Sequence, residues 1–261
     1  MQAHVRAIGI VGPGLPDWER ARPRLAGAEA YEAEPLPRLR SPLLPSAEAR
    51  RATALVHLAL CPSGQVLTDA ASVAADLPSV FASADGDLGI LERTCVSLTE
   101  AEPWISPHSF HNSVHNAPSG YWSIAAACTG PSTTLSAGND SFAVGLLEAV
   151  LLTNSDPAGA CLLVAYDQAS PASLAAARPV EHGFACALLL ERAPSGAGLD
   201  VRPGPPAASS GCDTPALESL RMGNPAARAL PLLEALARGE SRTLHFAYPT
   251  GTLQVGLKKP A

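Results

Sequence analysis

Residues 106–149 hold the side chains whose types and spacing could do chemistry. This segment contains a tight turn, Ala137-Gly138-Asn139, between a predicted short strand and a predicted long helix. A residue in such a turn faces the helix N-terminus, where unpaired amide groups and the helix dipole favour negative charge. That location suits a cysteine nucleophile, because the dipole lowers the thiol pKa. Here the residue is Asn139, and an amide is neither a nucleophile nor an acid–base group near neutral pH.

Other reactive side chains in this segment have simpler interpretations. His111 and His115 are spaced i, i+4 and could bind a metal on a helix, but no third ligand lies nearby in the sequence. Structural, hydrogen-bonded histidines fit better. Cys128 ends the apolar run SIAAAC and could be a displaced nucleophile, but a buried apolar cysteine is usually inert. Tyr121 and Trp122 are expected as core or interface aromatics. We therefore expect no metal site and no cofactor.

The elements that would position this segment alternate along the chain. Apolar, β-rich runs predict strands at residues 5–11, 79–83, 132–136, 160–166 and 184–190. Helical periodicity and capping residues predict helices at residues 47–60, 64–75, 87–98, 120–128 and 140–152. The last two strands hardly alternate between apolar and polar residues, which indicates central positions. Interleaved strands and helices predict an α/β layered domain with a mixed or parallel sheet.

Composition changes after Glu191. Residues 1–192 are predicted to form the layered domain, around a mixed five-stranded sheet with flanking helices. Residues 193–215 are rich in Pro, Gly and Ser and are predicted to be a linker. Residues 216–261 are predicted to form a small C-terminal appendage. It would consist of a helix and a β-hairpin, with the helix at 231–238, Gly239 as its C-cap and the hairpin strands at 243–248 and 252–257.

The overall composition excludes several classes of protein. The chain has 261 residues, 47% of them hydrophobic, and a net charge of −6, which argues against wholesale disorder and against a nucleic-acid surface. Its six cysteines form no CxxC pair and are too sparse for a disulfide scaffold. The apolar run at the N-terminus is too short for a signal peptide, and no stretch is long enough to span a membrane. We expect a cytoplasmic protein.

Three motifs resemble those of a known family. The runs N-A-P-S-G-Y-x-S-I, G-P-S and S-A-G-N-D-S, the last followed by a helix, resemble the N-terminal half of β-ketoacyl synthases. Those enzymes have the thiolase fold and carry N-x-P/A-x-G, G-P-N and S-T-A-C-x-S/T-G at the same spacings. The resemblance covers residues 3–191 and is most specific at 109–149. It implies a thiolase-like αβα architecture, of which this chain carries only the N-terminal half.

Two departures from that family bear on catalysis. The family's nucleophilic cysteine aligns with Asn139. Its two catalytic histidines belong to HGTGT and GHxxGA motifs in a C-terminal half, whereas the only histidine after residue 191 is His245, in TLHFAYPTG. A chain without these groups cannot run the condensation, so we expect no catalytic residue and no enzymatic activity from this chain alone.

An amide residue at the cysteine position resembles the chain-length factor of type II polyketide synthases, and FHNSVHNAPxGYWSI resembles proteins of aryl polyene pigment clusters. The resemblance implies a heterodimer with a full-length β-ketoacyl synthase, supplied by an acyl carrier protein. The partner would do the chemistry of polyketide or fatty-acid-like synthesis, and this chain would shape the acyl tunnel. The residues expected at the interface or tunnel are Phe110, His111, Asn112, His115, Asn116, Tyr121, Trp122 and Asn139.

Other functions stay open on the sequence. Asn139 could be a helix N-cap, or its amide could hold a malonyl thioester and assist decarboxylation. The chain could instead be an autonomous acyl- or malonyl-thioester hydrolase or decarboxylase that uses Cys128 or His115. It could also be a scaffold that docks an acidic carrier protein through basic residues, namely Arg38, Arg40, Arg50 and Arg51. The product and its chain length are not encoded in any motif.

Overall fold

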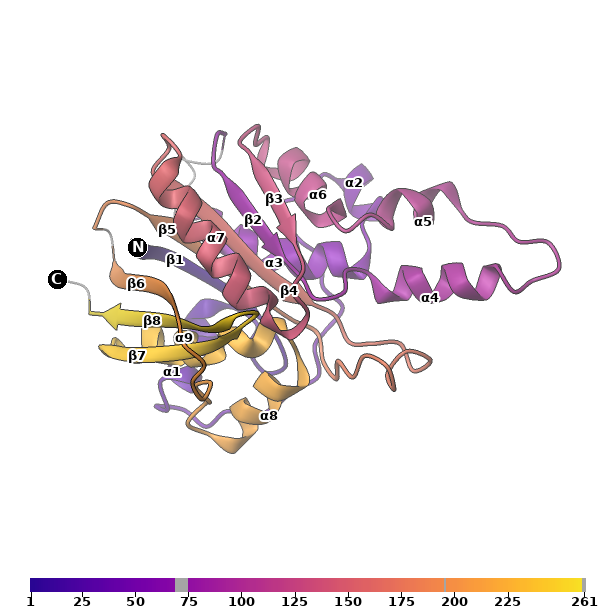
Figure 1. Ribbon diagram of the computed structural model, residues 1–261. Coiled ribbons are helices and arrows are strands. Elements are labelled where there is room, and N and C mark those ends of the chain that lie inside the picture. Colours follow the sequence, from indigo (N-terminus) through magenta and orange to yellow (C-terminus); the bar gives the residue numbers. More distant parts are fainter. Residues whose placement is uncertain (69–74, 195, 260–261) are drawn as a thin grey trace.

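A single mixed sheet forms the centre of the protein (Figure 1). In this computed structural model, which describes residues 1–68, 75–194 and 196–259, the strand order is β3-β2-β4-β5-β1-β6-β8-β7. Strands β3, β2 and β4 are parallel, and the remaining neighbours pair antiparallel. The strands are β1 (Gln2–Val11), β2 (Ser79–Ala82), β3 (Ser132–Leu135), β4 (Ala160–Asp167), β5 (Phe184–Glu191), β6 (Ala197–Gly204), β7 (Arg242–Tyr248) and β8 (Gly251–Lys258).

Helices cover the sheet, with α7 crossing in front of the strands and α3 behind them in Figure 1. The α-helices are α1 (Trp18–Leu25), α2 (Ser46–Arg51), α3 (Ala54–Thr68), α4 (Leu88–Ser97), α5 (Pro107–Asn112), α6 (Ala117–Ala126), α7 (Ser141–Ser155), α8 (Pro215–Gly223) and α9 (Leu230–Arg238). Two short 3-10 helices, η1 (Gly138–Asp140) and η2 (Ala226–Ala229), precede α7 and α9. None of the helices in the described ranges is long and apolar enough to cross a membrane.

Two hydrophobic cores lie on the two sides of the sheet. One contains buried side chains of α1, α7, α8 and α9, and the other contains those of α3 and α6. Along β4 and β5 the side chains contribute alternately to the two cores, and all eight residues of β4 are buried. This explains why the sequences of these strands do not alternate, because both of their faces are covered. The prediction that they are central strands is confirmed.

The α/β layered architecture is confirmed, but the predicted five-stranded sheet is wrong. Strand β6 lies within the range that was predicted as a linker and pairs with β1 on one side and β8 on the other. The C-terminal hairpin then extends the same sheet through β8 and β7. Residues 197–258 therefore add three strands, and Leu199, Val201 and Leu253 join a core that begins at Ala3.

The helix predicted at 47–60 is broken into α2 and α3. Ala52, which follows α2, has extended backbone angles (φ −68°, ψ 139°), so the chain turns before α3 begins. Helix α3 then continues through Pro62 to Thr68, and the rest of the helix predicted at 64–75 lies largely outside the described residues. Its close packing on β1 requires Gly9, because a Cβ atom there would lie 2.0 Å from the Pro62 carbonyl oxygen.

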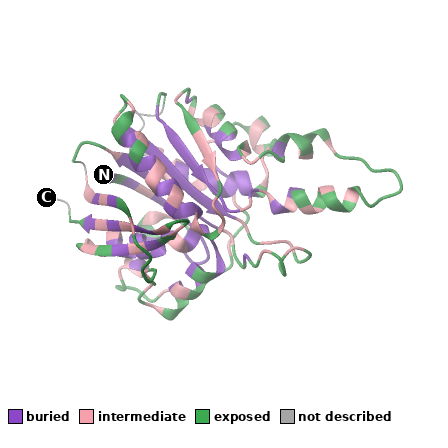
Figure 2. Ribbon diagram, in the orientation of Figure 1, coloured by how far each residue is buried: buried purple, intermediate pink, exposed green. Residues whose placement is uncertain are grey.

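Helices α4 and α5 form an arm that projects from the body of the molecule (Figure 1). Asp87 caps α4 by accepting a hydrogen bond from the Ile90 amide, and Ser106 caps α5 in the same way from Ser109. Figure 2 shows that most of this arm is exposed. We call residues 88–116 the α4–α5 arm.

Candidate functional site

The turn that precedes α7 is built as the sequence predicts. Strand β3 ends at Leu135, η1 follows, and α7 begins at Ser141. Gly138 adopts a left-handed conformation (φ 57°), which glycine accommodates without strain. Helix α7 lies close against β2 at Gly145, where a Cβ atom would come within 2.8 Å of the Ala82 Cβ. The turn is therefore held at the carboxyl end of the parallel strands, where α/β sheets bind ligands.

This turn contains no activated nucleophile. Asn139 is exposed, and none of the described residues hydrogen-bonds to its side chain. The Ser141 hydroxyl is buried and committed to the backbone: it donates to the Gly138 carbonyl (2.7 Å) and accepts from the Ala137 amide (2.9 Å). The N-cap interpretation of Asn139 is wrong, because the capping position of α7 is Asp140.

A small cavity of about 230 Å³ lies beside the turn. Phe142 and Phe246, which pack edge to face with ring centroids 5.4 Å apart, form part of its wall. Burial raises the pKa of Asp140, and the positive charge of Arg228 opposes that rise. Asn139 also lines this cavity, together with the charged side chains of Arg221 and Arg228.

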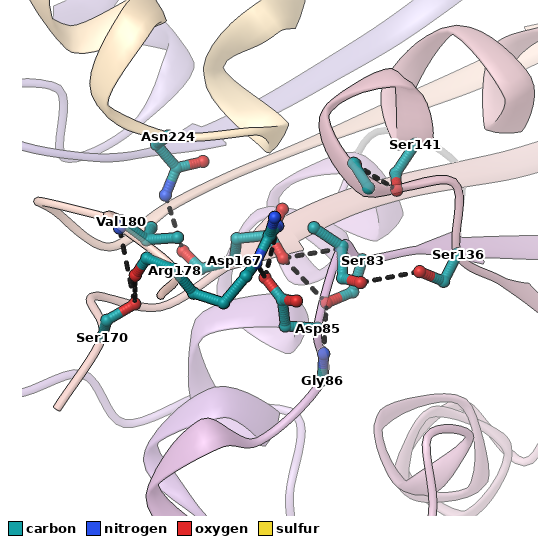
Figure 3. A network of polar contacts seen from close by, with 12 residues as sticks. Ser83, Asp85, Gly86, Ser136, Ser141, Asp167, Ser170, Arg178, Val180 and Asn224 are labelled. Atoms are coloured by element: carbon teal, nitrogen blue, oxygen red, sulfur yellow. Dashed lines mark hydrogen bonds and ion pairs between the residues drawn. The ribbon is translucent and has the colours of Figure 1, made fainter. Parts of the chain in front are cut away.

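A buried carboxyl group ties the ends of β2 and β4 together (Figure 3). Asp167 Oδ1 accepts hydrogen bonds from the Ser83 hydroxyl (2.9 Å) and the Ala84 amide (2.8 Å). The Ser136 hydroxyl, after β3, donates to the Ala84 carbonyl (2.6 Å), which links the network to the turn. Burial is the main cause that raises the pKa of Asp167 to about 7, and its Oδ2 has no partner among the described residues.

Three further contacts hold this network to the rest of the fold. Asn224 donates to the backbone carbonyls of Asp167 (2.9 Å) and His182 (2.6 Å). Arg178 pairs with Asp85 at 2.8 Å. Sequence reasoning missed this network, although an acid that directly follows an apolar strand, as Asp167 ends β4, is a signal that could have found it.

The predicted interface residues on the arm divide into exposed and buried ones. Phe110 is 71% exposed and His111 is exposed as well. Asn112 is buried and donates through Nδ2 to the His108 carbonyl (3.0 Å), so it holds α5 together. Asn116 is exposed and occupies the N-cap position of α6 without a side-chain hydrogen bond. The interface role of these residues stays a prediction.

His111 and His115 do not share a helix, because α5 ends at Asn112. His115 is half-buried and packs against Gly86, where a Cβ atom would lie 3.1 Å from its ring. Within the described ranges, no group of three or more His, Cys, Asp or Glu side chains is arranged to hold a metal ion.

Tyr121 and Trp122 belong to the core between α3, α6 and the sheet. Trp122 is fully buried and its ring lies 6.5 Å from that of Phe81, centroid to centroid. Tyr121 is buried as well, and burial raises its pKa. These two side chains pack inside the core next to α6. Their predicted contact with a partner stays a prediction.

Cys128 and His115 lie at opposite ends of α6. That helix has 10 residues and rises about 15 Å, so the two side chains cannot act as a nucleophile and base pair. The Cys128 thiol is buried and donates to the Leu77 carbonyl at 3.3 Å. All six cysteines are free thiols.

Large apolar side chains gather on and near the arm. Trp104 is 68% exposed and Phe110 71%, and the other exposed members of this set are Leu91, Val96, Leu98, Ile105, Val114 and Ile124. Strand β3, at the edge of the sheet, lies next to α6, and its outer side pairs with no described strand. Monomeric proteins rarely expose so many large apolar groups together, so the arm has the character of an interaction surface.

The sequence and fold can be compared with those of known proteins. Residues 18–247 match the family model described as "Beta-ketoacyl synthase, N-terminal domain". The chain belongs to this family. No curated protein matches the chain in sequence. This β-ketoacyl synthase domain therefore has the layered, thiolase-like architecture, here with an eight-stranded mixed sheet.

Several solved structures share the fold, and this chain covers different shares of their chains. One is the ketosynthase ApeO in complex with its chain length factor ApeC from Xenorhabdus doucetiae, with 26% identity, a TM-score of 0.70 and coverage of 99% of this chain and 100% of that chain. A chain of the AntDE:AntF complex of a type II polyketide ketosynthase with its acyl-carrier protein matches at 10% identity and a TM-score of 0.73, covering 100% and 99%. The ketosynthase of module 6 of the bacillaene synthase from Bacillus subtilis 168 matches at 14% identity and a TM-score of 0.56, covering 84% of this chain but 44% of that one.

Proposed function

We propose that this chain is a non-catalytic chain-length factor that pairs with a full-length β-ketoacyl synthase. The observation that carries the proposal is the turn before α7, where the family places its cysteine and where this chain has the exposed amide of Asn139. The neighbouring hydroxyl of Ser141 is occupied by backbone hydrogen bonds and has no basic side chain as a partner. A turn of this kind can line a site, but it cannot form an acyl-enzyme.

The exposed apolar surface of the α4–α5 arm supports the association. Phe110 and Trp104 are the kind of aromatic anchors that dominate binding energies at protein interfaces. Coverage of 100% of a chain in the ketosynthase–chain length factor complex, against 44% of the bacillaene module 6 ketosynthase, also favours the role of a short partner.

The role in the pathway follows from that association. The partner would carry the growing chain, delivered by an acyl carrier protein, and this subunit would limit the space into which the chain grows. Residues of the arm and of α6 would line or support that tunnel, in the synthesis of a polyketide of the aryl polyene type. The acyl-carrier protein in the AntDE:AntF structure makes such a carrier a reasonable third component.

Co-expression tests this proposal. We expect the tagged chain to co-purify, in equal amounts, with the full-length β-ketoacyl synthase encoded nearest to its gene, and the pair to extend acyl groups on a carrier protein. Asn139→Ala should leave that rate within about 2-fold, because the amide does not react. A fall of roughly 100-fold or more in the rate with Asn139→Ala, or a soluble chain that forms no pair, would contradict the proposal. If exchanging this subunit for a relative leaves the product length unchanged, a docking scaffold is the better description.

The purified chain alone should not hydrolyse or decarboxylate acyl thioesters. Cys128 is hydrogen-bonded within the core, and His115 lies at the far end of α6. We expect turnover of malonyl and acyl carrier-protein thioesters to equal the uncatalysed background, measured by mass spectrometry of the carrier protein. Turnover that Cys128→Ala or His115→Ala removes would show instead that the chain is an autonomous enzyme.

A further inference from the structure

A second, larger cavity lies on the α3 side of the sheet, away from Asn139. Its volume is about 700 Å³, a size typical of small-molecule sites. Gln168 and Ala169, which follow β4, and Gly183, which precedes β5, form one end of it. It therefore opens near the carboxyl end of a central parallel strand, where α/β sheets commonly bind ligands. The remaining wall comes from α2, α3 and the extended segment 36–40. We call it the α2–α3 cavity.

The charges that line this cavity have one sign. Arg38, Arg40 and Arg50 line it, and no acidic residue is among the described residues that do. None of the three guanidinium groups forms an ion pair or a side-chain hydrogen bond within the described structure; the neighbouring Arg51 pairs with Glu48. In a chain with a net charge of −6, three unpaired arginines around one cavity form a local positive site.

The rest of the lining is mostly apolar. Leu36, Leu39 and Leu58 face the cavity, together with the methyl groups of Ala49 and Ala52. Apolar walls with a few polar groups at one side are the usual plan of a ligand pocket. A molecule that fills this cavity would bury an apolar body and present negative charge to the arginines.

His57 fixes the elements that carry the arginines. Its Nδ1 accepts a hydrogen bond from the Ser41 amide (3.2 Å), and its Nε2 lies 3.2 Å from the Ala49 carbonyl. These bonds connect the segment that bears Arg38 and Arg40, and the helix that bears Arg50, to α3. Burial lowers the pKa of His57, the hydrogen bond to the Ala49 carbonyl opposes that change, and the positive charges of Arg40 and Arg38 add to it. A lower pKa favours the neutral ring, which can accept the hydrogen bond at Nδ1. These hydrogen bonds hold the walls of the cavity together.

We propose that the α2–α3 cavity binds an anionic amphiphile, a small molecule with a phosphate or carboxylate group on an apolar chain. Arginine is well suited to this role, because its planar group binds either anion through two parallel hydrogen bonds. The proposal does not depend on the chain-length-factor role, because none of the residues that line this cavity belongs to the α4–α5 arm.

Dodecyl phosphate is the probe that tests the ligand class. We expect calorimetry on the full chain, below the micelle concentration of the probe, to show saturable binding at one site. Dodecanol, which lacks the charge, and inorganic phosphate, which lacks the chain, should each bind at least about 10-fold more weakly. Dodecanoate should bind as well. Equal binding of dodecanol would overturn the proposal, because the arginines would then contribute nothing.

Variants locate the site. Arg38→Gln combined with Arg40→Gln should weaken dodecyl phosphate binding by about 10-fold or more, since two charge-assisted hydrogen-bond partners are lost. Ala52→Trp should block binding without changing charge. Arg20→Gln combined with Arg22→Gln removes the same charge from α1, outside the cavity, and should leave affinity within about 2-fold.

Two further measurements distinguish a small amphiphile from a lipid bilayer and from an acidic carrier protein as the source of the anionic group. Vesicles that contain phosphatidylglycerol should not retain the chain, because the head groups of a bilayer cannot enter a concave site. Binding to such vesicles, or to an acidic carrier protein, that depends on Arg38 and Arg40 while dodecyl phosphate fails to bind would overturn the proposal. Equal loss of dodecyl phosphate binding in the cavity double variant and the α1 double variant would overturn it as well.

Discussion

Phe110→Asp is expected to abolish the proposed association with a ketosynthase. The side chain is 71% exposed on α5, and it lies among the other exposed apolar groups of the arm. Burial of a phenylalanine in an interface contributes about 1.5–3 kcal/mol. The variant loses that contribution and adds a carboxylate that the interface would have to desolvate without a partner, at a further cost of several kcal/mol. We therefore expect affinity to fall by at least roughly 100-fold, measured by biolayer interferometry with the purified ketosynthase.

Met222→Asp provides the matched control for this prediction. Met222 is also a large exposed apolar residue, 55% exposed, but it lies on α8, which packs with η2 and is far along the chain from the arm. The same change of charge there should leave affinity within about 3-fold. Both variants should melt within a few degrees of the parent, since neither side chain belongs to a core. If Phe110→Asp binds as tightly as Met222→Asp, the arm is not the interface and the proposed heterodimer must use another face.

The central strands could be predicted because their signal is local. Strands β4 and β5 are covered on both faces, so each reads as a continuous apolar run. Strand β6 has no such run, and its sequence, AGLDVRPG, reads as a turn or linker. It forms a strand because β1 and β8, which lie in distant parts of the chain, pair with it on either side. A strand that depends on its neighbours for burial has a weak sequence signal, so β6 is missed. The hairpin strands β7 and β8 are predicted, but without β6 they are assigned to a separate appendage and not to the main sheet.

The candidate site is also predictable only where its signal is local in the sequence. The strand-turn-helix around Asn139 follows from glycine, the flanking apolar periodicity and the family motif. The helix break at Ala52 was not predictable, because the residues around it favour a helix and a tertiary contact, through His57, decides the geometry. Asp167 could be seen as an acid after a strand, but its burial depends on Ser83 and Asn224, which lie 84 and 57 residues away.

Asp167 should make the stability of this protein fall as pH rises. Its pKa is raised from 3.8 to about 7, chiefly by burial, so between these values the folded state holds a proton that the unfolded state has lost. Stability from this group is therefore complete at low pH and is lost as pH increases through about 7. This rise in the pKa of Asp167 corresponds to a cost on the order of 4 kcal/mol when the buried carboxylate is ionised.

Asp167→Asn removes this ionisation and keeps the shape. The amide oxygen can still accept from the Ser83 hydroxyl and the Ala84 amide, as Oδ1 does in the parent. We expect the variant to match the parent within about 1 kcal/mol at pH 4 and to exceed its stability by a few kcal/mol at pH 9. Urea unfolding from pH 4 to pH 9 measures both. Glu29→Gln, which removes an exposed carboxylate without a described partner, should leave the pH profile unchanged.

Ser83→Ala distinguishes titration of Asp167 from a general loss of packing. The hydroxyl donates to the ionised carboxylate and so opposes the rise in pKa caused by burial. Without it, the fall in stability should still begin near pH 4, where the unfolded carboxyl ionises, but the pH at which the fall ends should move upward. A merely destabilised protein would lose stability equally at every pH. A profile that is parallel to that of the parent in both Asp167→Asn and Ser83→Ala would show that Asp167 is already ionised near neutral pH. The carboxyl that joins β2 and β4 beside the Asn139 turn would then be a buried anion, held by the hydrogen bonds from the Ser83 hydroxyl and the Ala84 amide.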